Sequence, residues 1–232
     1  MRASVPSSSA AGEETRPQDA GLRGRRAAVV VAHPDDETLW AGGTILTYPD
    51  CSWYVVSLCR KGDPDRAPRF LQALKKLGAS GQMADLDDGP EQRPLGEELV
   101  EKTILDLLPG RRFDLLLTHG PWGEYTRHLR HEETGRAVVS LWRAGKMCCD
   151  TLWLFAYEDG AGQYLPRAAQ EANLTIPLPE NVWQEKHRII TEVYGFAPDS
   201  FEARTTPRRE AFWCFHSAPE VQDWMVRGGS RR

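Results

Sequence analysis

Four side chains that can bind a metal or move a proton stand within five positions near the start of the chain: His33, Asp35, Asp36 and Glu37. They follow a short, continuously apolar run at 27–32, which is typical of a buried parallel strand. Carboxylates at this place could simply complement the first turn of a helix, whose free N–H groups favour acidic residues. Capping accounts for one or two acids and leaves the histidine unexplained, so a helix start and a metal site both remain open.

A second cluster holds three of the chain's six histidines: His119, His128 and His131. His33 and Asp36, three residues apart in a tight turn, could offer one nitrogen and one oxygen to the same ion, and a histidine from a neighbouring strand end would complete the set. Three protein ligands leave positions for water and substrate, as in catalytic zinc sites. The same ligand set also suits iron(II).

The rest of the sequence alternates apolar strands with amphipathic helices. Strands are expected at 27–32, 53–58, 115–118 and 151–157, and helices at about 39–46, 70–77, 96–108 and 132–144. This order predicts an α/β fold, a Rossmann-like, mostly parallel sheet with helices on both faces. Ligands in such sheets bind beyond the carboxyl ends of the strands, where both clusters fall. From about position 160 the chain is expected to form an irregular C-terminal extension with one helix at 181–194.

Composition excludes several classes of protein. The 232 residues are 41% hydrophobic, enough for a core, and the formal net charge of −4 offers no basic field for nucleic acid. No run approaches the length of a membrane helix and the N-terminus lacks a signal-peptide core, so we expect a soluble, cytoplasmic protein without an integral membrane segment. The five cysteines contain no Cys-x-x-Cys pair, which leaves nitrogen and oxygen ligands for any metal. Residues 1–26 and 226–232 are expected to be flexible tails around a single domain at 27–225.

The string Ala-His-Pro-Asp-Asp-Glu at 32–37, followed downstream by a His-x-x-His pair at 128–131, resembles the PIG-L/LmbE-like family of metal-dependent N-acetylglucosaminyl deacetylases. Similar segments also occur at 59–63, 66–78, 87–89 and 123–125. Together they cover roughly residues 27–157. The resemblance implies that the substrate is a small-molecule amino-sugar conjugate, whose N-acetyl group is hydrolysed to acetate and a free amine.

Carried over by position, the resemblance implies that zinc, or iron(II) in its place, is bound by His33, Asp36 and His131. It makes Asp35 the general base that takes a proton from the attacking water. It makes His128 the residue that stabilises or protonates the tetrahedral intermediate.

The substrate contacts implied by the same resemblance are Arg66, Asp88 and, by analogy with a mobile tyrosine of some relatives, Tyr125. Family members often carry Pro-Asp between the two histidines, where this chain has Leu-Arg at 129–130. An acidic neighbour that could tune the first histidine of the pair is therefore missing.

Two side chains near the clusters have more ordinary explanations. Glu37 is expected to cap the helix. The alternative is that Glu37 supports one of the site residues through a direct contact. His119 is expected to be a hydrogen-bonded partner of the site rather than a ligand.

Two other functions compete with a deacetylase. A non-catalytic or regulatory carbohydrate-binding protein on the same fold would have no use for a free carboxylate beside a metal, although the altered 129–130 pair keeps this alternative open. A nucleotide-binding protein would need a G-x-G-x-x-G turn after the first strand, where this chain has acids that would repel a pyrophosphate. The sequence gives no signal for the oligomeric state.

Overall fold

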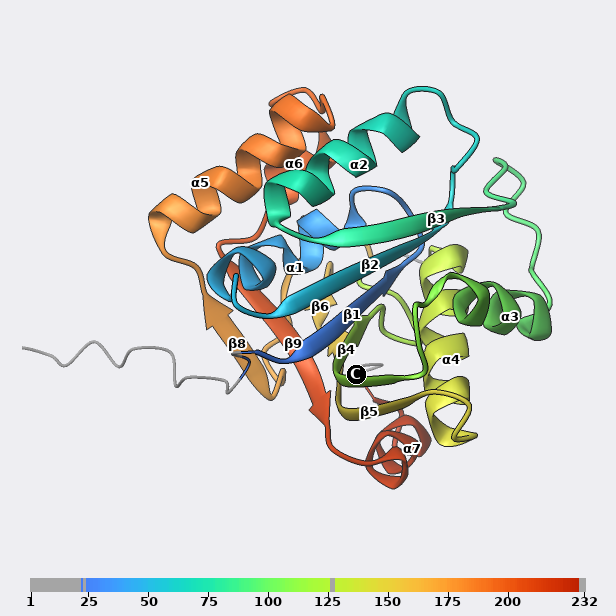
Figure 1. Cartoon of the computed structure of the whole chain (residues 1–232). Helices are drawn as coiled ribbons and strands as arrows, with labels where there is room; N and C mark the ends of the chain where they lie inside the picture. The colour runs from blue at the N-terminus through green and yellow to red at the C-terminus, as the bar shows by residue number, and fades with distance from the viewer. Residues whose placement is uncertain (1–21, 23, 126–127, 230–232) are drawn as a thin grey trace, which may run out of the picture.

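Seven strands form one sheet in the order β3-β2-β1-β4-β5-β9-β8 (Figure 1). The structure is a computed structural model that describes residues 22, 24–125 and 128–229. The parallel strands are β1 (Arg26–Val31), β2 (Ser52–Cys59), β3 (Ser80–Leu86), β4 (Arg112–Thr118) and β5 (Cys148–Phe155). β9 (Arg209–Phe215) runs antiparallel to β5, and β8 (Leu174–Pro177) runs antiparallel to β9. β6 (Tyr157–Glu158) pairs with β7 (Arg167–Ala168) in a separate ribbon.

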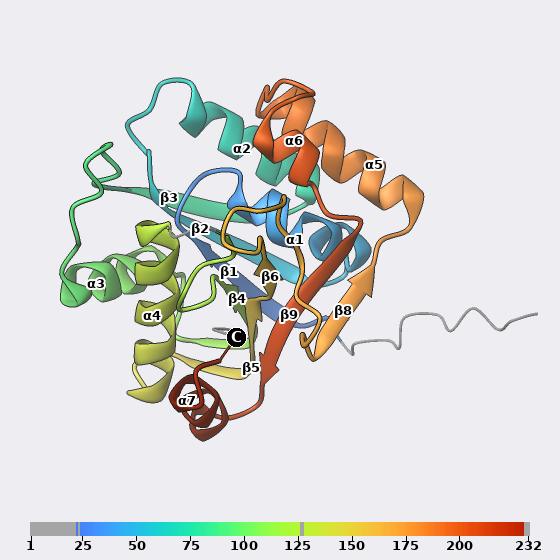
Figure 2. The same cartoon turned by 180° about the vertical axis from the view of Figure 1, so that it is seen from behind.

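Helices cover both faces of this sheet (Figures 1 and 2). One face carries α1 (Asp36–Thr47), α2 (Arg66–Leu77), α5 (Glu180–Arg188), the π-helical turn η1 (Ile189–Val193) and α6 (Phe201–Thr205). The other face carries α3 (Glu97–Leu107), α4 (Leu129–Arg143) and α7 (Ala218–Val226). Val29 and Val31 of β1 belong to the first core, whereas Ala28 and Val30 belong to the second. Burial on both faces explains the continuous apolar run of β1 and confirms the expected α/β fold.

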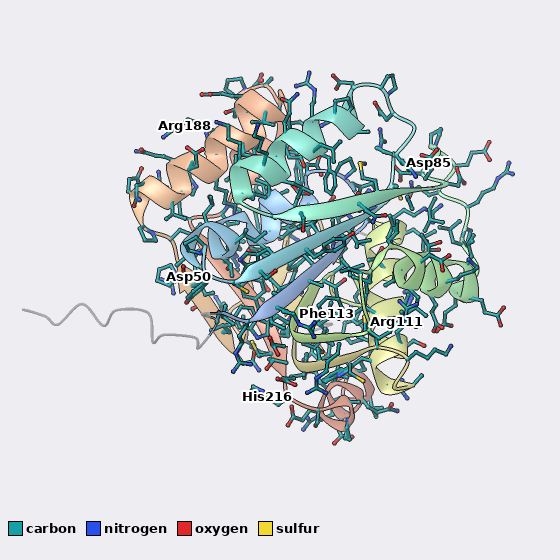
Figure 3. The ribbon with its side chains drawn as sticks, in the orientation of Figure 1. Asp50, Asp85, Arg111, Phe113, Arg188 and His216 are labelled. Carbon is teal, nitrogen blue, oxygen red and sulfur yellow. The ribbon has the colours of Figure 1, made fainter. Side chains whose placement is uncertain are left out.

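The directions of the strands bring the two chemical clusters to one edge of the sheet. β1 and β4 are adjacent and parallel, with Val30 in register with Thr118, so the loops that follow them leave the sheet side by side. Figure 3 marks the two edges: Asp50 precedes β2 at the amino-terminal edge, and Asp85 lies near the carboxyl end of β3.

Helix α2 illustrates how local sequence fixes the position of a site residue. Asp63 Oδ1 accepts the N–H groups of Asp65 and Arg66, each at 2.9 Å, so the helix begins with Arg66 facing the carboxyl edge of the sheet. The helix ends at Gly78, whose φ of 69° is the left-handed conformation expected of a glycine after the last turn.

Two regions differ from the sequence expectation. β3 gives no strand signal, because it is an edge strand whose residues are largely half-buried or exposed. The C-terminal part is more regular than the irregular extension we expected. It adds β8 and β9 to the sheet, and Phe212, Trp213 and Phe215 are strand residues whose side chains pack in the two cores.

The flexible tails expected at 1–26 and 226–232 lie largely outside the described residues. Where the structure does describe them, Leu22 is buried in the first core, β1 begins at Arg26, and α7 continues to Val226. Regular structure among the described residues therefore reaches Arg26 at one expected boundary and Val226 at the other. Among the described residues, no helix combines the length and apolarity needed to cross a bilayer.

A buried ion pair ties the C-terminal part to helix α1. Glu210 of β9 accepts the N–H groups of Gly43 and Thr44, both at 2.7 Å, and the Thr44 hydroxyl at 2.6 Å. Lys186 of α5 completes the cluster with Nζ 2.6 Å from Glu210 Oε1. Both charged side chains are fully buried, so neither can exchange its partner for water.

We expect Lys186→Met to lower the free energy of unfolding by about 3 kcal/mol, because it leaves the Glu210 carboxylate buried without its cation. Urea unfolding followed by circular dichroism measures this loss. The matched control is Lys102→Met, since Lys102 pairs with Asp106 on the exposed surface of α3 and should cost about 0.5 kcal/mol or less. Equal losses for the two variants would contradict this account of the pair.

Candidate metal centre and active site

Three side chains from the two loops converge at the carboxyl edge of the sheet. His33 Nδ1 lies 3.1 Å from Asp36 Oδ2 and 3.2 Å from His131 Nε2. His131 Nε2 lies 3.3 Å from Asp36 Oδ2, which closes the triangle. Two nitrogens and one oxygen therefore face one another, although 98 positions separate the two histidines in the sequence.

This triangle has the size that one metal ion requires. Ligand atoms about 2.1 Å from a shared ion at octahedral to tetrahedral angles are separated by about 3.0 to 3.4 Å. The three separations found here fall within that range. The residues that the sequence nominated as ligands thus fit one divalent ion that keeps open positions.

Each of these three side chains has a second partner that aims its free atom into the triangle. His131 Nδ1 contacts Glu124 Oε2 at 2.7 Å, and His33 Nε2 contacts Asp88 Oδ1 at 3.2 Å. With these nitrogens protonated as donors, the opposite nitrogen of each ring keeps its lone pair for a metal. Asp36 Oδ1 accepts the indole N–H of Trp40 at 3.2 Å, which orients the carboxylate.

Other donor groups lie nearby in the described part of the chain, and their atoms also come within 4.8 Å of one another: His33 with His128 and His131, His33 with Cys59 and Asp88, and Asp36 with His119 and His131. The second group is unfavourable because Asp88 already accepts from Arg60 Nε at 3.0 Å. Burial raises the pKa of the Cys59 thiol, which disfavours the thiolate that a metal needs. The first group, His33 with His128 and His131, lacks a carboxylate, although that of Asp36 is buried beside two of its members.

Both ring nitrogens of His119 form hydrogen bonds within the protein. Its Nε2 accepts the N–H of Ala32 at 3.0 Å, and its Nδ1 donates to Glu124 Oε2 at 2.9 Å. Glu124 is therefore shared by His119 and His131. Burial would raise the pKa of Glu124, but the two imidazoles, His119 foremost, lower it to about 2. His119 thus supports the site through a hydrogen bond, which is the role that the sequence favoured.

Asp35 occupies a strained turn at the base of a cavity of about 210 Å³. Its φ of 134° lies outside the regions that L-residues favour. Its Oδ2 atom is 3.8 Å from Arg66 NH1. Burial, followed by the negative charge of Asp36, raises the pKa of Asp35 well above the usual carboxyl range. A raised pKa brings a carboxylate closer to the value that suits proton transfer near neutral pH.

His128 lines the same cavity. Its ring stacks on His131 with centroids 4.3 Å apart, and its Nδ1 is buried without a hydrogen-bond partner among the described residues. Burial, then the neighbouring His131 and His33, lower its pKa to about 3. That this histidine stabilises or protonates the tetrahedral intermediate stays a prediction, and among the described residues no carboxylate forms a hydrogen bond or ion pair with its ring.

Arg130, which stands where relatives often have an acid, points away from His128. It is buried, and its guanidinium donates to the carbonyl oxygens of Asp87 and Arg93 and to Glu133. These contacts clamp the loop between β3 and α3 onto α4. The same loop carries Asp88, so the departure from the family pattern has a structural role beside the site.

The three expected substrate contacts all line the cavity, together with residues that the sequence did not single out for binding. Arg66 and Tyr125 face it directly. Asp88 also lines it, but its oxygens already accept from His33, Arg60 and Gln92, and these hydrogen bonds lower its pKa despite burial. The additional lining comes from Arg60, Leu39, Pro34, Phe196, Phe201 and Glu202.

Comparison with known families agrees with this geometry. Residues 28–142 match the PIG-L family, described as GlcNAc-PI de-N-acetylase. The chain belongs to the PIG-L family. The matched residues run from β1 to α4 and so contain the whole metal triangle and Asp35.

Solved structures share the fold at low sequence identity. The N,N'-diacetylchitobiose deacetylase of Pyrococcus horikoshii is 15% identical with a TM-score of 0.66, and the match covers 88% of each chain. The A40926 pseudoaglycone deacetylase is 16% identical with a TM-score of 0.56, covering 84% of this chain and 98% of that one. The 4-carboxy-2-hydroxymuconate hydratase of Pseudomonas putida is 15% identical with a TM-score of 0.52, covering 89% and 90%. One fold thus carries two reaction types, so the reaction of this PIG-L protein must be argued from its site.

We expect Glu124→Gln to weaken Zn²⁺ binding by about 10- to 100-fold, because His131 loses the carboxylate that fixes its ring. His33→Ala and His131→Ala should lose more, since each removes a donor atom. Competition with a chromophoric chelator measures the affinities, and His187→Ala, in α5 and away from the triangle, is the control. Wild-type affinity in His131→Ala would refute the proposed ligand set.

Arg130→Met should accelerate amide hydrogen exchange across residues 87–93, because the loop loses its clamp on α4. Arg136→Met is the matched control on the same helix, since the Arg136 guanidinium pairs with Glu132 near the surface. Unchanged exchange at 87–93 in Arg130→Met would show that the loop is held by other contacts.

Proposed function

We propose that this PIG-L protein is a zinc-dependent deacetylase that hydrolyses the N-acetyl group of an N-acetylglucosamine-type conjugate, releasing acetate and a free amine. The observation that carries the proposal is the open triangle of His33, Asp36 and His131 with the carboxylate of Asp35 in the same cavity. The family description as a GlcNAc-PI de-N-acetylase and the deacetylases among the structural neighbours support the same reaction class.

The residues present suit amide hydrolysis. His33, Asp36 and His131 would hold a divalent ion, which would supply Lewis acidity to the acetyl carbonyl and to the attacking water. Asp35 accepts the proton of that water as the water oxygen bonds to the carbonyl carbon. The same proton then passes from Asp35 to the departing nitrogen when the carbon–nitrogen bond breaks.

His128 contributes as a neutral hydrogen-bond donor in this scheme. Its imidazole lies in the cavity without a carboxylate partner, so its N–H is available to the oxygen on which negative charge develops. Because burial and the neighbouring imidazoles lower the pKa of His128, its neutral form is favoured, and in this scheme the leaving amine takes its proton from Asp35.

The sugar is expected to bind through Arg66 and Tyr125, with Asp88 at the rim. Arg66 NH1 is buried and has no hydrogen-bond acceptor in the described part of the chain, so it can donate to a substrate hydroxyl. Phe196 and Phe201 give the cavity an aromatic wall, on which the apolar face of a sugar ring can pack.

The test is a panel of N-acetylated amino sugars, including N-acetylglucosamine and N,N'-diacetylchitobiose, offered to protein stripped of metal and then reloaded with Zn²⁺ or Fe²⁺. Free amine and acetate are measured together, and we expect equal amounts of both with Zn²⁺. Greater turnover with Fe²⁺ would reassign the metal. Sugar binding without release of either product from any member of the panel would instead favour a carbohydrate-binding protein.

Asp35→Asn should lower kcat by about 10²- to 10⁴-fold while zinc affinity is retained, because the amide cannot accept the proton. Asp85→Asn, an exposed aspartate near the carboxyl end of β3, is the control and should keep wild-type turnover (Figure 3). An Asp35→Asn variant with most of its activity would exclude Asp35 as the base.

A further inference from the structure

The strained backbone of Asp35 must be held by its surroundings. Its φ of 134° with ψ of −29° is a conformation that L-residues rarely adopt, and it persists only where the surroundings hold it. The Asp35 carbonyl accepts the N–H groups of Thr38 and Leu39, at 3.0 and 2.8 Å, in the first turn of α1. Its own N–H donates to Glu37 Oε2 at 3.0 Å. Glu37 therefore does more than cap the helix, because it fixes the residue that carries the proposed base.

Glu37 is held in turn by the C-terminal part of the chain. Its side chain is fully buried, and Oε1 accepts both the Thr38 hydroxyl and the Tyr194 hydroxyl at 2.6 Å. Tyr194 lies 157 positions further along the sequence. The Glu37 carboxylate thus joins two long-separated segments, one oxygen on the Asp35 amide and the other on the tyrosine.

Tyr194 reaches this position from the π-helical turn η1. The Tyr194 N–H donates to the carbonyl of Ile189, five residues earlier, at 3.0 Å. Arg69 of α2 fixes the turn by donating to the carbonyl of Val193 at 2.9 Å. Figure 2 shows α5 and α6, which flank this turn, beside α2. The π-helical turn is the last turn after α5, and it places Tyr194 directly before Gly195, whose φ of 77° lies in the left-handed region.

The same segment reaches the carboxylate of Asp35 by a second route. Phe196, two residues beyond Tyr194, enters the cavity, and the guanidinium carbon of Arg66 lies 4.4 Å from its ring centroid. Arg66 NH1 in turn lies 3.8 Å from Asp35 Oδ2. A cation held over an aromatic face is restricted in where it can point, so Phe196 limits the orientation of Arg66.

We propose that the segment from η1 to Phe196 positions Asp35 for catalysis, with Tyr194 acting through Glu37 on the backbone and Phe196 acting through Arg66 on the carboxylate. Tyr194, Glu37 and Phe196 are positioning residues, since none of them needs to touch the reacting atoms. This inference rests on the proposed function for its catalytic consequence, while its structural core concerns the conformation of Asp35 alone.

Tyr194→Phe is the most economical test, because it removes one hydroxyl from a buried ring. We expect kcat to fall about 10- to 100-fold with KM and zinc affinity unchanged, since only the placement of the base is disturbed. Tyr157→Phe is the matched control, because the Tyr157 hydroxyl is also buried and contacts Trp40 O and Ala211 N but not Glu37. Equal losses of kcat in both variants, or a loss confined to KM, would overturn the proposal.

A double-mutant cycle separates positioning from general stability. If Tyr194 acts through Asp35, then Tyr194→Phe should cause no further loss of kcat in the Asp35→Asn background. A second full loss in that background would show that Tyr194 acts elsewhere. Glu37→Gln, which keeps the size of the side chain but puts an N–H₂ group among three donors, should reproduce the effect of Tyr194→Phe and covers the case in which one variant folds poorly.

A measurement that needs no substrate distinguishes failure of this inference from failure of the proposed function. Amide hydrogen exchange followed by nuclear magnetic resonance should show faster exchange at the Asp35 N–H in Tyr194→Phe, with the Leu39 N–H unchanged. Unchanged exchange at Asp35 would refute the positioning role even in an active deacetylase. Faster exchange would support it even if no N-acetyl sugar were hydrolysed.

Discussion

The contact of one buried carboxylate, Asp36, with the imidazoles of His33, His119 and His131 is the interaction on which the rest of the site depends. Asp36 is almost fully buried, and burial alone would raise its pKa, yet His131 and His119 lower it well below the usual range. A carboxylate charged in such a place needs cationic or hydrogen-bonding neighbours. The segment after β1, which carries His33 and Asp36, meets the segment after β4, which carries His119 and His131, because β1 and β4 are adjacent and parallel. The strand order of the sheet therefore assembles the site.

The second half of the chain completes a site that its first half begins. Glu210 and Lys186 fasten β9 and α5 to helix α1, which follows the turn that carries His33 and Asp35. From this anchored part, Tyr194 and Phe196 reach the surroundings of Asp35. The buried ion pair thus contributes to the geometry of the site as well as to stability, because it fixes the frame from which the positioning side chains extend.

The departure from the family pattern at 129–130 bears on the role proposed for His128. Arg130 holds the loop that carries Asp88, and the ring of His128 packs against those of His33 and His131, with no carboxylate bonded to it among the described residues. A neutral His128 can still donate a hydrogen bond to developing charge, but it has no extra proton for the leaving group. In the proposed mechanism the proton for the leaving amine therefore comes from Asp35, so the placement of that carboxylate matters more.

The sequence by itself determined the strands β1, β2, β4 and β5 and nominated His33, Asp35, Asp36 and His131, because apolar runs and a dense motif are local signals. It did not determine the edge strand β3, whose half-exposed residues lack a periodic pattern, nor the antiparallel β9. Only the tertiary structure decided that Glu124 is shared by two histidines and that Tyr194 holds Glu37. Such contacts join residues through space, and a side chain's partner 157 positions away leaves no trace in the spacing of its neighbours.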